Sequence, residues 1–167
     1  MKFTESELEK AIIELFVAEN YQHQHGAAIQ RALNEVLIQQ DLKLFLLNRY
    51  AAHAITDNEI NGMIRTMAQL PDSALYDSNK TIINHIANGF VLKRENRSQK
   101  DLFIQFIDFE NTSNNRFKIV NQLEIQGYEK RILDAIVYIN GLPLVVLEFK
   151  TAIEENKTIR DAYTQLT

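Results

Sequence analysis

Two acidic residues and one lysine near the C-terminal end of the chain have the types and spacing for metal-dependent phosphodiester chemistry. Glu148 and Lys150 follow an apolar run, Leu144 to Leu147, that is typical of a buried β-strand. Side chains two positions apart on a strand share a face, about 7 Å apart, so these two are predicted to project together. Asp134 interrupts the preceding apolar run, Ile132 to Ile139, where an apolar residue would pack better. We therefore expect two carboxylates and one ammonium group to meet at one corner of a sheet.

Such a set of groups is suited to hydrolysing a phosphodiester. Carboxylates bind Mg²⁺, and the ion polarises the phosphate, neutralises developing charge and lowers the pKa of an attacking water. Lys150 would orient that water or stabilise the charged transition state. Without metal the two carboxylates repel each other, so the pKa of at least one is expected to be raised. Taken alone, Glu148 and Lys150 are more simply explained as a strand end reaching solvent, and Asp134 alone as a surface residue near a turn.

The turn between the two apolar runs sets a geometric condition on this site. Asn140-Gly141 is a strong hairpin signal. A plain two-residue loop there would pair Asp134 with Leu147, and Asp134 and Glu148 would then point to opposite faces. We therefore predict a loop with an odd number of residues, or a bulge that shifts the register by one.

The elements that must position these groups form a helical first part and a β-rich second part. Capping boxes, in which a threonine precedes a glutamate by three residues, are expected to begin helices at Thr4 and Thr56. Asn88-Gly89 is typical of a helix end. Apolar residues at helical spacing also indicate helices over residues 8–16, 29–37 and 42–46.

After Gly89 the pattern changes to short β-type runs separated by polar turns. We expect strands at about 90–94, 101–109, 116–126, 131–139 and 143–150, and helical character again from residue 151. The predicted fold class is α/β, with a mainly helical part, residues 1–88, packed on a short mixed sheet, residues 89–167. No repeat or linker separates the parts, so one integrated domain is expected.

Composition limits the kinds of site and partner. The chain has 167 residues, no cysteine and a net charge of −4. Without cysteine there are no disulfides or thiolate metal sites, so any metal is held by oxygen or imidazole. No apolar run approaches the roughly 20 residues that cross a bilayer, and no secretory signal is evident, so we expect a cytoplasmic protein without a membrane partner. The negative charge opposes DNA binding by bulk electrostatics, so attached domains or partner subunits are expected to hold the duplex.

Histidines and a basic cluster offer weaker candidates. For His23 and His25 we favour a solvated loop over a metal site, because no third ligand is evident. His53 and His85 each stand alone on expected helices and receive the same structural interpretation. Contact with DNA phosphates and an ordinary charged turn are evenly balanced for a basic cluster around an expected hairpin loop, Lys93, Arg94, Arg97 and Lys100.

The segments around the candidate site carry a resemblance to a known family. They are IDFENTSNNRFKIVNQ from Ile107, the stretch Arg131 to Asp134, and NGLPLVVLEFK ending at Lys150. The sequence resembles the N-terminal endonuclease domain of type I restriction enzyme R subunits, within the PD-(D/E)xK nuclease superfamily. The resemblance runs from about Glu9 to Gln165. The bare D…ExK pattern is weak alone, because these residue types are common, but joined to these segments it is specific.

The resemblance implies a restriction-endonuclease-like core and a type I site-specific deoxyribonuclease that makes Mg²⁺-dependent double-strand breaks in DNA. It implies catalytic roles for Asp134, Glu148 and Lys150, with Asp134 and Glu148 as metal ligands. Gln165 resembles the catalytic glutamine that opens the family's Q-x-x-x-Y motif. Glu9 is the third candidate metal residue, because it matches an acidic residue on the first helix that can approach the metals, although a role at the helix dipole is the favoured alternative. The implied partners are the methyltransferase and specificity subunits.

Two features depart from the family pattern. Leu133 stands where the family usually has a proline before the catalytic aspartate, which affects the local bend. No phosphate-binding G-x-x-x-x-G-K-[ST] loop occurs, so ATP would act only through motor domains absent from this chain. We therefore expect a fragment of a longer subunit or a truncated gene product.

Two other functions stay open. The chain could be a docking module that joins the R subunit to the methyltransferase and specificity subunits, with little activity alone. It could also be a stand-alone repair or junction nuclease of the same superfamily, which a genomic neighbourhood without methyltransferase and specificity genes would favour.

Overall fold

The computed structural model describes residues 4–68, 74–127 and 129–150. These residues form four α-helices, a mixed four-stranded sheet and a two-stranded sheet, which confirms the predicted α/β class. The chain contacts define two compact units. The first comprises the described parts of residues 1–37, 117–139 and 143–167, and the second comprises those of 38–116 and 140–142. The division at residue 88 within one integrated domain stays a prediction.

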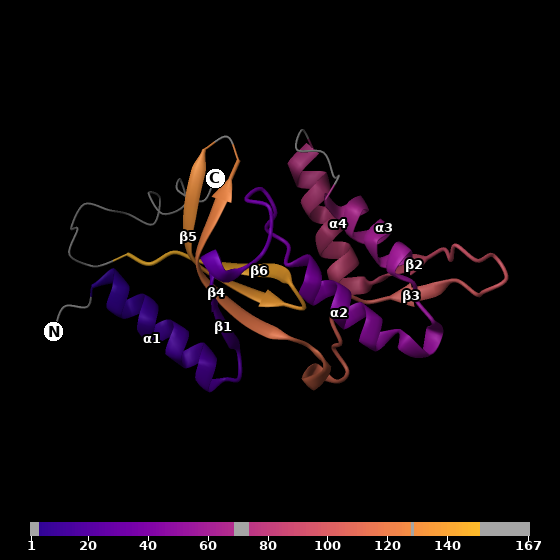
Figure 1. Ribbon diagram of the computed structural model, residues 1–167, viewed down its shortest axis with the longest axis horizontal. Coiled ribbons are helices and arrows are strands. Elements are labelled where there is room, and N and C mark those ends of the chain that lie inside the picture. The colour runs from indigo at the N-terminus through magenta and orange to yellow at the C-terminus, as the bar shows by residue number, and fades with distance from the viewer. Residues whose placement is uncertain (1–3, 69–73, 128, 151–167) are drawn as a thin grey trace. The chain divides into compact units, whose positions relative to one another are not determined.

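The four-stranded sheet belongs to the first unit, apart from the initial residue of its last strand, and has the order β1-β4-β5-β6 (Figure 1). Strands β1 and β4 are parallel, whereas β4 and β5 are antiparallel and pair along almost their whole length. The polar strand β1, all glutamine and histidine, was not predicted, because it has no apolar alternation. The strands are β1 (Gln22–His25), β4 (Phe117–Gln126), β5 (Lys130–Ile139) and β6 (Leu142–Leu147).

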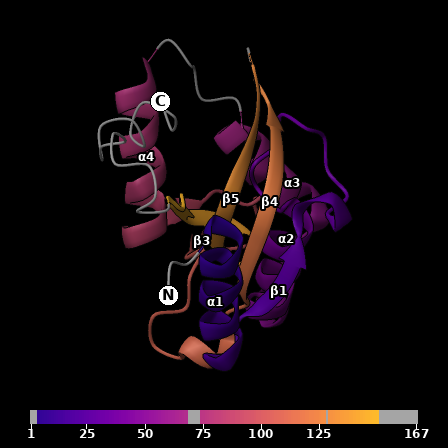
Figure 2. The same cartoon turned by 90° about the vertical axis from the view of Figure 1, so that its left-hand side faces the viewer.

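Helix α1 (Glu5–Ala18) covers part of this sheet and lies beside β1 in both views (Figure 1 and Figure 2). The predicted capping box is present: the Thr4 hydroxyl accepts a hydrogen bond from the Glu7 amide, and the Glu7 carboxylate accepts one from the Thr4 amide. The apolar face of α1 packs against two fully buried residues, Ile119 of β4 and Ala135 of β5. The packed side chains of the helix are Leu8, Ile12, Ile13 and Phe16.

The helix predicted over residues 29–37 is wrong. This segment consists of turns and bends. Hydrogen bonds from the Arg31 side chain, rather than helical backbone hydrogen bonds, bind its carbonyl groups. The Arg31 guanidinium donates to backbone carbonyls within the segment, including that of Glu35 at 2.6 Å, and to the carbonyl of Glu124 on β4. The apolar residues of this stretch therefore belong to a loop that is bonded to β4.

The described residues of the second unit form three α-helices and the small antiparallel sheet (Figure 1). Helices near residues 42 and 57 were predicted, and Thr56 with Glu59 forms the expected capping box. Gly89, at φ +68°, ends the last helix as predicted. The elements are α2 (Gln39–Arg49), α3 (Asp57–Ala68), α4 (Leu75–Asn88), β2 (Phe90–Leu92) and β3 (Leu102–Ile104).

The basic cluster between β2 and β3 divides into one structural and three exposed residues. Arg94 is buried, and its guanidinium donates to the Glu59 carboxylate at 2.8 Å and to the carbonyls of His53 and Ala54. Lys93, Arg97 and Lys100 are exposed. The Arg94 side chain is thus part of the interior.

The turn between β5 and β6 contains two residues, so the first of the two predicted arrangements, a loop with an odd number of residues, is wrong; the second, a bulge that shifts the register, stays a prediction. Asn140 and Gly141 both have positive φ, +52° and +80°, as a tight I′-type hairpin turn requires. The structure satisfies the geometric condition differently, because β6 ends at Leu147 and Glu148 lies beyond the strand. Strand alternation therefore does not fix the direction of the Glu148 side chain.

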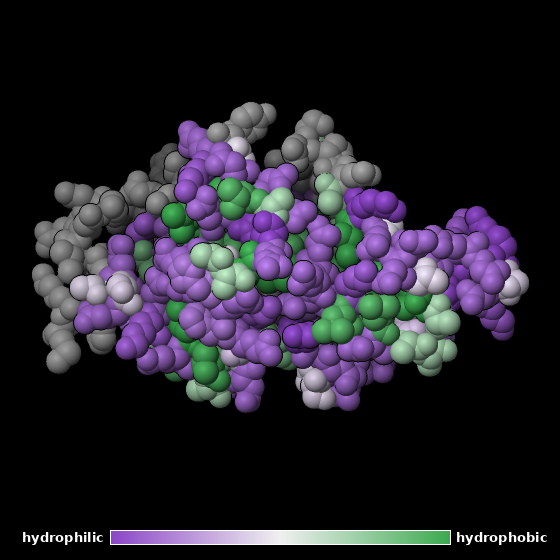
Figure 3. Space-filling model, in the orientation of Figure 1, coloured by the Kyte–Doolittle hydropathy of each residue, from purple (hydrophilic) through white to green (hydrophobic). Residues whose placement is uncertain are grey.

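The expected strand over 143–150 is also shorter and more exposed than predicted. Leu144, Val145 and Val146 are between 39% and 48% exposed, so β6 is a partly solvent-facing edge of the sheet in the described part of the chain. On the face shown in Figure 3, hydrophilic side chains predominate and apolar ones form small separate groups.

Among the described residues, none of the helices is long and apolar enough to cross a membrane.

Candidate functional site

Asp134 of β5 lies against the backbone of the segment that follows β6. Its Oδ2 accepts a hydrogen bond of 2.7 Å from the amide of Phe149. The Phe149 ring is buried with Ile119 and Ala135, which fixes the backbone that carries Glu148 and Lys150. The structure thus places Asp134 next to both sequence-predicted partners.

Glu148 and Lys150 project together, as predicted. The Lys150 ammonium donates to Glu148 Oε1 at 2.9 Å, with side chains 30% and 11% exposed. This hydrogen bond, with the nearby carboxylate charges, raises the pKa of Lys150, so the ammonium form is favoured. The positive charge of Lys150 therefore acts on both Glu148 and Asp134.

Burial and neighbouring charges both act on the pKa of Asp134. Burial is the main cause that raises the pKa of Asp134, and the hydrogen bond from Phe149 opposes it. The charges of Glu148 and Glu9 raise the pKa further, whereas Lys150 lowers it. A raised pKa was expected for one of two neighbouring carboxylates, although burial contributes more than Glu148.

Glu9 reaches the same region from α1. Its two carboxylate oxygens accept hydrogen bonds from the side-chain amides of Asn121 and Gln122, at 2.7 and 3.0 Å. Its charge acts on Asp134, and that of Glu5, one turn earlier on α1, acts on Lys150. The first helix therefore presents acidic side chains toward the site.

A groove of about 490 Å³ lies beside Glu9. It is bounded by α1, by His23 of β1 and by Asn121 of β4. The carboxylate of Glu9 is half-buried, so a group in this groove has access to it. The lining residues are Ser6, Glu9, Lys10, Ile13, Glu14, Val17, His23 and Asn121.

The remaining candidate residues take other positions. Gln165 lies outside the described residues. His23 and His25 belong to β1 rather than to the predicted loop; His23 Nε2 lies 2.9 Å from Asn121 Oδ1, and His25 accepts a hydrogen bond from the Ala27 amide. Within the described residues no group of three or more histidine and acidic side chains has the geometry to hold a metal ion. Glu9, Asp134 and Glu148, all of them described residues, therefore do not form such a group.

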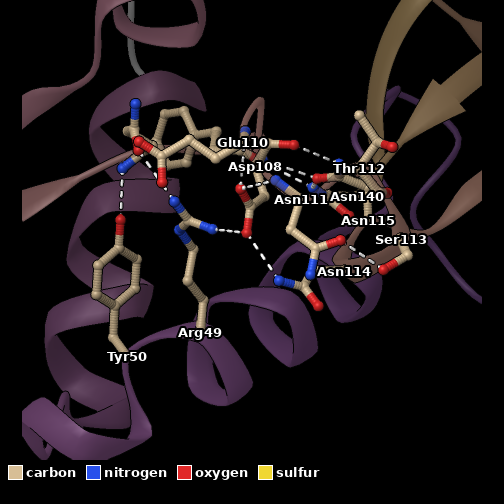
Figure 4. A network of polar contacts seen from close by, with 12 residues as sticks. Arg49, Tyr50, Asp108, Glu110, Asn111, Thr112, Ser113, Asn114, Asn115 and Asn140 are labelled. Atoms are coloured by element: carbon tan, nitrogen blue, oxygen red, sulfur yellow. Dashed lines mark hydrogen bonds and ion pairs between the residues drawn. The ribbon is translucent and has the colours of Figure 1, made fainter.

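The first part of the family-like segment, residues 107–115, builds a structural network (Figure 4). Asp108 is buried, forms an ion pair with Arg49 of α2, and accepts hydrogen bonds from the amides of Glu110 and Asn111 and from the Asn114 side chain. The fully buried Asn140 bonds to the backbone of Phe106 and to the Asn115 side chain. This polar network therefore holds the hairpin turn in place.

Sequence reasoning missed the contacts that Asn121 and Gln122 make to Glu9. The sequence pattern marks the two residues only as part of a family-like segment. Two adjacent amides in a run of apolar residues, Ile119, Val120 and Leu123, were the available signal, because a regular strand would bury one of them without a partner.

Comparison with known proteins identifies the family. The profile of the family described as type I restriction enzyme R protein N terminus matches residues 2–167. The chain belongs to this family.

Relatives of the R protein N terminus include named endonuclease subunits. A Methanocaldococcus jannaschii protein, provisionally named as the endonuclease subunit of the type I restriction enzyme MjaIXP, is 28% identical over 93% of this chain and 16% of its own length. The HindI type I endonuclease subunit of Haemophilus influenzae is 32% identical over 66% of the chain and 11% of its own length. The SauCOLORF180P subunit of Staphylococcus aureus is 24% identical over 71% and 12%. The chain therefore spans less than a fifth of the length of these relatives.

Proposed function

We propose that this chain is the DNA-cleaving part of a type I restriction enzyme R subunit, hydrolysing phosphodiester bonds with Mg²⁺ bound by Asp134 and Glu148. The observation that carries the proposal is the hydrogen bond from the Phe149 amide to Asp134. It joins the lone acid of β5 to the segment that carries Glu148 and Lys150. The names of the relatives, which are endonuclease subunits, support the same chemistry.

The donor set fits a hard divalent cation. Carboxylate oxygens are the ligands that Mg²⁺ prefers, and Mg²⁺ commonly uses only one or two carboxylates, with waters and substrate phosphate completing its shell. Two acids therefore suffice without a third protein ligand. When bound, the cation would polarise the phosphate and supply a water of lowered pKa. The raised pKa of Asp134 marks a place where a positive charge would be favourable.

The residues of the chain have distinct roles in this proposal. Asp134 and Glu148 hold the cation, and the buried Phe149 keeps their spacing constant. Lys150 places its ammonium group within reach of a phosphate oxygen or of the attacking water, where charge develops in the transition state. Its present hydrogen bond to Glu148 would be exchanged for that contact when DNA enters.

Partners are part of the proposal, because the chain alone has a net charge of −4. We propose that the rest of the R subunit supplies ATP-driven translocation and that methyltransferase and specificity subunits supply site recognition. Basic surfaces on these parts would hold the duplex while the acidic domain cuts it.

The decisive experiment replaces Glu148 or Lys150 by alanine in the assembled restriction enzyme. We expect DNA cleavage to fall by about 10²-fold or more, as for other residues that stabilise a transition state electrostatically, while ATP-driven translocation continues. Glu124→Ala is the matched control, because it removes an acid of β4 that forms an ion pair with Lys130 of β5, outside the site. Unchanged cleavage in Glu148→Ala would remove the proposal.

A further inference from the structure

The carboxylate of Glu9 is held at both oxygens by neighbouring residues of one strand. Asn121 Nδ2 donates to Oε1 and Gln122 Nε2 donates to Oε2. A glutamate on a helix surface normally keeps its rotamer freedom, and fixing such a long side chain costs conformational entropy. Here both ends of the carboxylate are fixed, so its orientation is set by β4.

Two adjacent residues of a regular strand cannot make this contact together. Their side chains point to opposite faces of the sheet, so only one amide could reach α1. Gln122 departs from the regular strand, with φ +51° in the middle of β4. A non-glycine residue in this left-handed region is strained and persists only where its surroundings enforce it. The distortion allows both amides to serve the same carboxylate.

Gly26 leaves the space that the distorted backbone needs. A Cβ atom at Gly26 would lie 2.6 Å from the Gln122 carbonyl oxygen and 2.6 Å from Leu123 Cα. Only glycine leaves room for the displaced backbone. On the other side, His23 contacts Asn121 Oδ1 at 2.9 Å, which orients the Asn121 amide with its NH₂ group toward Glu9.

The register of the sheet connects this contact to the candidate site. Asn121 pairs with Ala135 and Leu123 pairs with Leu133. Gln122, between them, is therefore opposite Asp134. The distorted residue that holds Glu9 thus sits across the ladder from the acid of β5.

We propose that Asn121 and Gln122 are positioning residues whose amides hold Glu9 beside Asp134, and that Gly26 makes the required backbone of Gln122 possible. Their importance for catalysis rests on the proposed function, in which Asp134 binds the cation. In that setting Glu9 adds a negative charge at a fixed place near the cation. The charge supports cation binding without Glu9 being a direct ligand.

The hold itself is tested in the metal-free chain by a double-mutant cycle between Glu9 and Asp134. Glu9→Gln, Asp134→Asn and the double variant are unfolded with urea at pH 7 in EDTA. Because like charges held close together repel, each single substitution removes the same repulsion, and the shifts of the urea midpoint should not add. The cycle is then repeated with Gln122→Gly, which removes the amide and tolerates positive φ. In that background the shifts should become additive.

A second variant and a control separate positioning from stability. Gln122→Asn keeps a residue that tolerates the left-handed backbone but shortens its amide by one carbon, so it should also abolish the coupling. Gln126→Gly removes the same side chain from the end of β4 and should leave the coupling intact. Additive shifts in the wild-type background, or coupling that survives in both Gln122 variants, would overturn the inference. If both Gln122 variants lower the urea midpoint but keep the coupling between Glu9 and Asp134, the inference is likewise overturned.

Cation binding gives an independent readout. Mn²⁺ affinity of the chain is measured by calorimetry for wild type, Asn121→Ala, Gln122→Gly and the Gln126→Gly control. We expect a loss of about fivefold or more in the two positioning variants and none in the control. Measurable Mn²⁺ binding with equal affinity in all four proteins would overturn the inference. If wild type and Glu148→Ala are alike in binding no Mn²⁺, the proposed function fails, and the metal-free cycle alone decides whether the amides position Glu9.

Discussion

Asp108 is a buried carboxylate that is held by hydrogen bonds inside the second unit. Hydrogen bonds from the Asn111 amide and the Asn114 side chain, aided by Arg49, lower its pKa to about 2. We expect Asp108→Asn to lower the free energy of unfolding at pH 7 by about 1–3 kcal/mol, because it removes a charge-assisted network and leaves buried donors unsatisfied. Urea unfolding measures this loss.

The pH dependence of Asp108 gives that prediction a sign. The folded-state pKa lies below the ordinary value of 3.8, so the ionised carboxylate stabilises the fold above about pH 4 and this contribution is lost as the pH falls toward 2. The difference between wild type and Asp108→Asn should therefore shrink over this window. The exposed Asp101 provides the control, and a difference that stays constant from pH 7 to pH 2.5 would contradict the assigned role.

The buried pair of Arg94 and Glu59 leads to a second prediction at this scale. Burial alone would raise the pKa of Glu59, but hydrogen bonds from Arg94, Thr56 and Glu95 lower it to about 2. Arg94→Ala leaves this carboxylate unpaired and should cost about 3–5 kcal/mol of stability. Arg97→Ala, on the exposed part of the same cluster, should change stability by less than about 0.5 kcal/mol. Thermal unfolding of both variants checks this, and equal effects would refute the division of the cluster.

Which charged residues do chemistry and which support the fold was only partly predictable. Asp134, Glu148 and Lys150 stood out because each follows or interrupts an apolar run. Arg94 and Lys93 are alike in sequence, and only the distant Glu59 distinguishes them. The pairing of Glu9 with Asn121 depends on contacts more than a hundred residues apart, which local periodicity does not encode.

At the scale of elements, some glycines are required by the backbone conformation and others can be replaced by alanine. Gly141 has φ +80°, and a Cβ there would collide with the carbonyl oxygen of Ile38. Gly141→Ala should therefore destabilise the chain by about 1–3 kcal/mol. Gly62, inside α3, has open space where a Cβ would lie, with no neighbouring atom within 4 Å, so Gly62→Ala should instead stabilise it by about 0.5–1 kcal/mol. Chemical unfolding of the two variants should show opposite shifts; shifts of the same sign would disprove the assignment.

Elements with strong local signals were predicted well, and those held by distant contacts were not. The capping boxes at Thr4 and Thr56 and the Asn140-Gly141 turn act within a few residues, so the sequence near them sufficed. Strand β1 is polar and forms only because β4 offers it a parallel partner. The loop over 29–37 has helical apolar spacing, but Arg31 bonds its carbonyls instead.

At the scale of the whole molecule, the negative net charge predicts weak DNA binding by the chain alone. We expect a dissociation constant in the range of about 10⁻⁴ to 10⁻⁶ M or weaker for a 20-base-pair duplex at physiological salt, as for non-specific binding. Mg²⁺ should strengthen it, because the cation offsets the acids of the site. Fluorescence anisotropy with and without Mg²⁺ measures this, and nanomolar binding in EDTA would contradict it.

The α/β class could be predicted because helical and β-type periods occupy different parts of the sequence. The two units could not, because each draws on segments far apart in the chain. The end of the last described strand was mispredicted for a related reason. The apolar pattern predicts a strand that continues to Lys150, whereas β6 stops at Leu147 and the Phe149 side chain packs in the core.

The burial of Asn140 has a consequence for chemical ageing of the chain. In an Asn-Gly sequence the backbone nitrogen of the glycine readily attacks the asparagine side chain, which loses ammonia and becomes an acid. Asn140 is fully buried, and its side-chain amide is engaged with Phe106, Asn115 and Arg116, so it is held away from that reaction. Asn61 and Asn88, which precede Gly62 and Gly89, are exposed and lack such burial, so deamidation during storage should begin at these two residues while the hairpin turn stays intact.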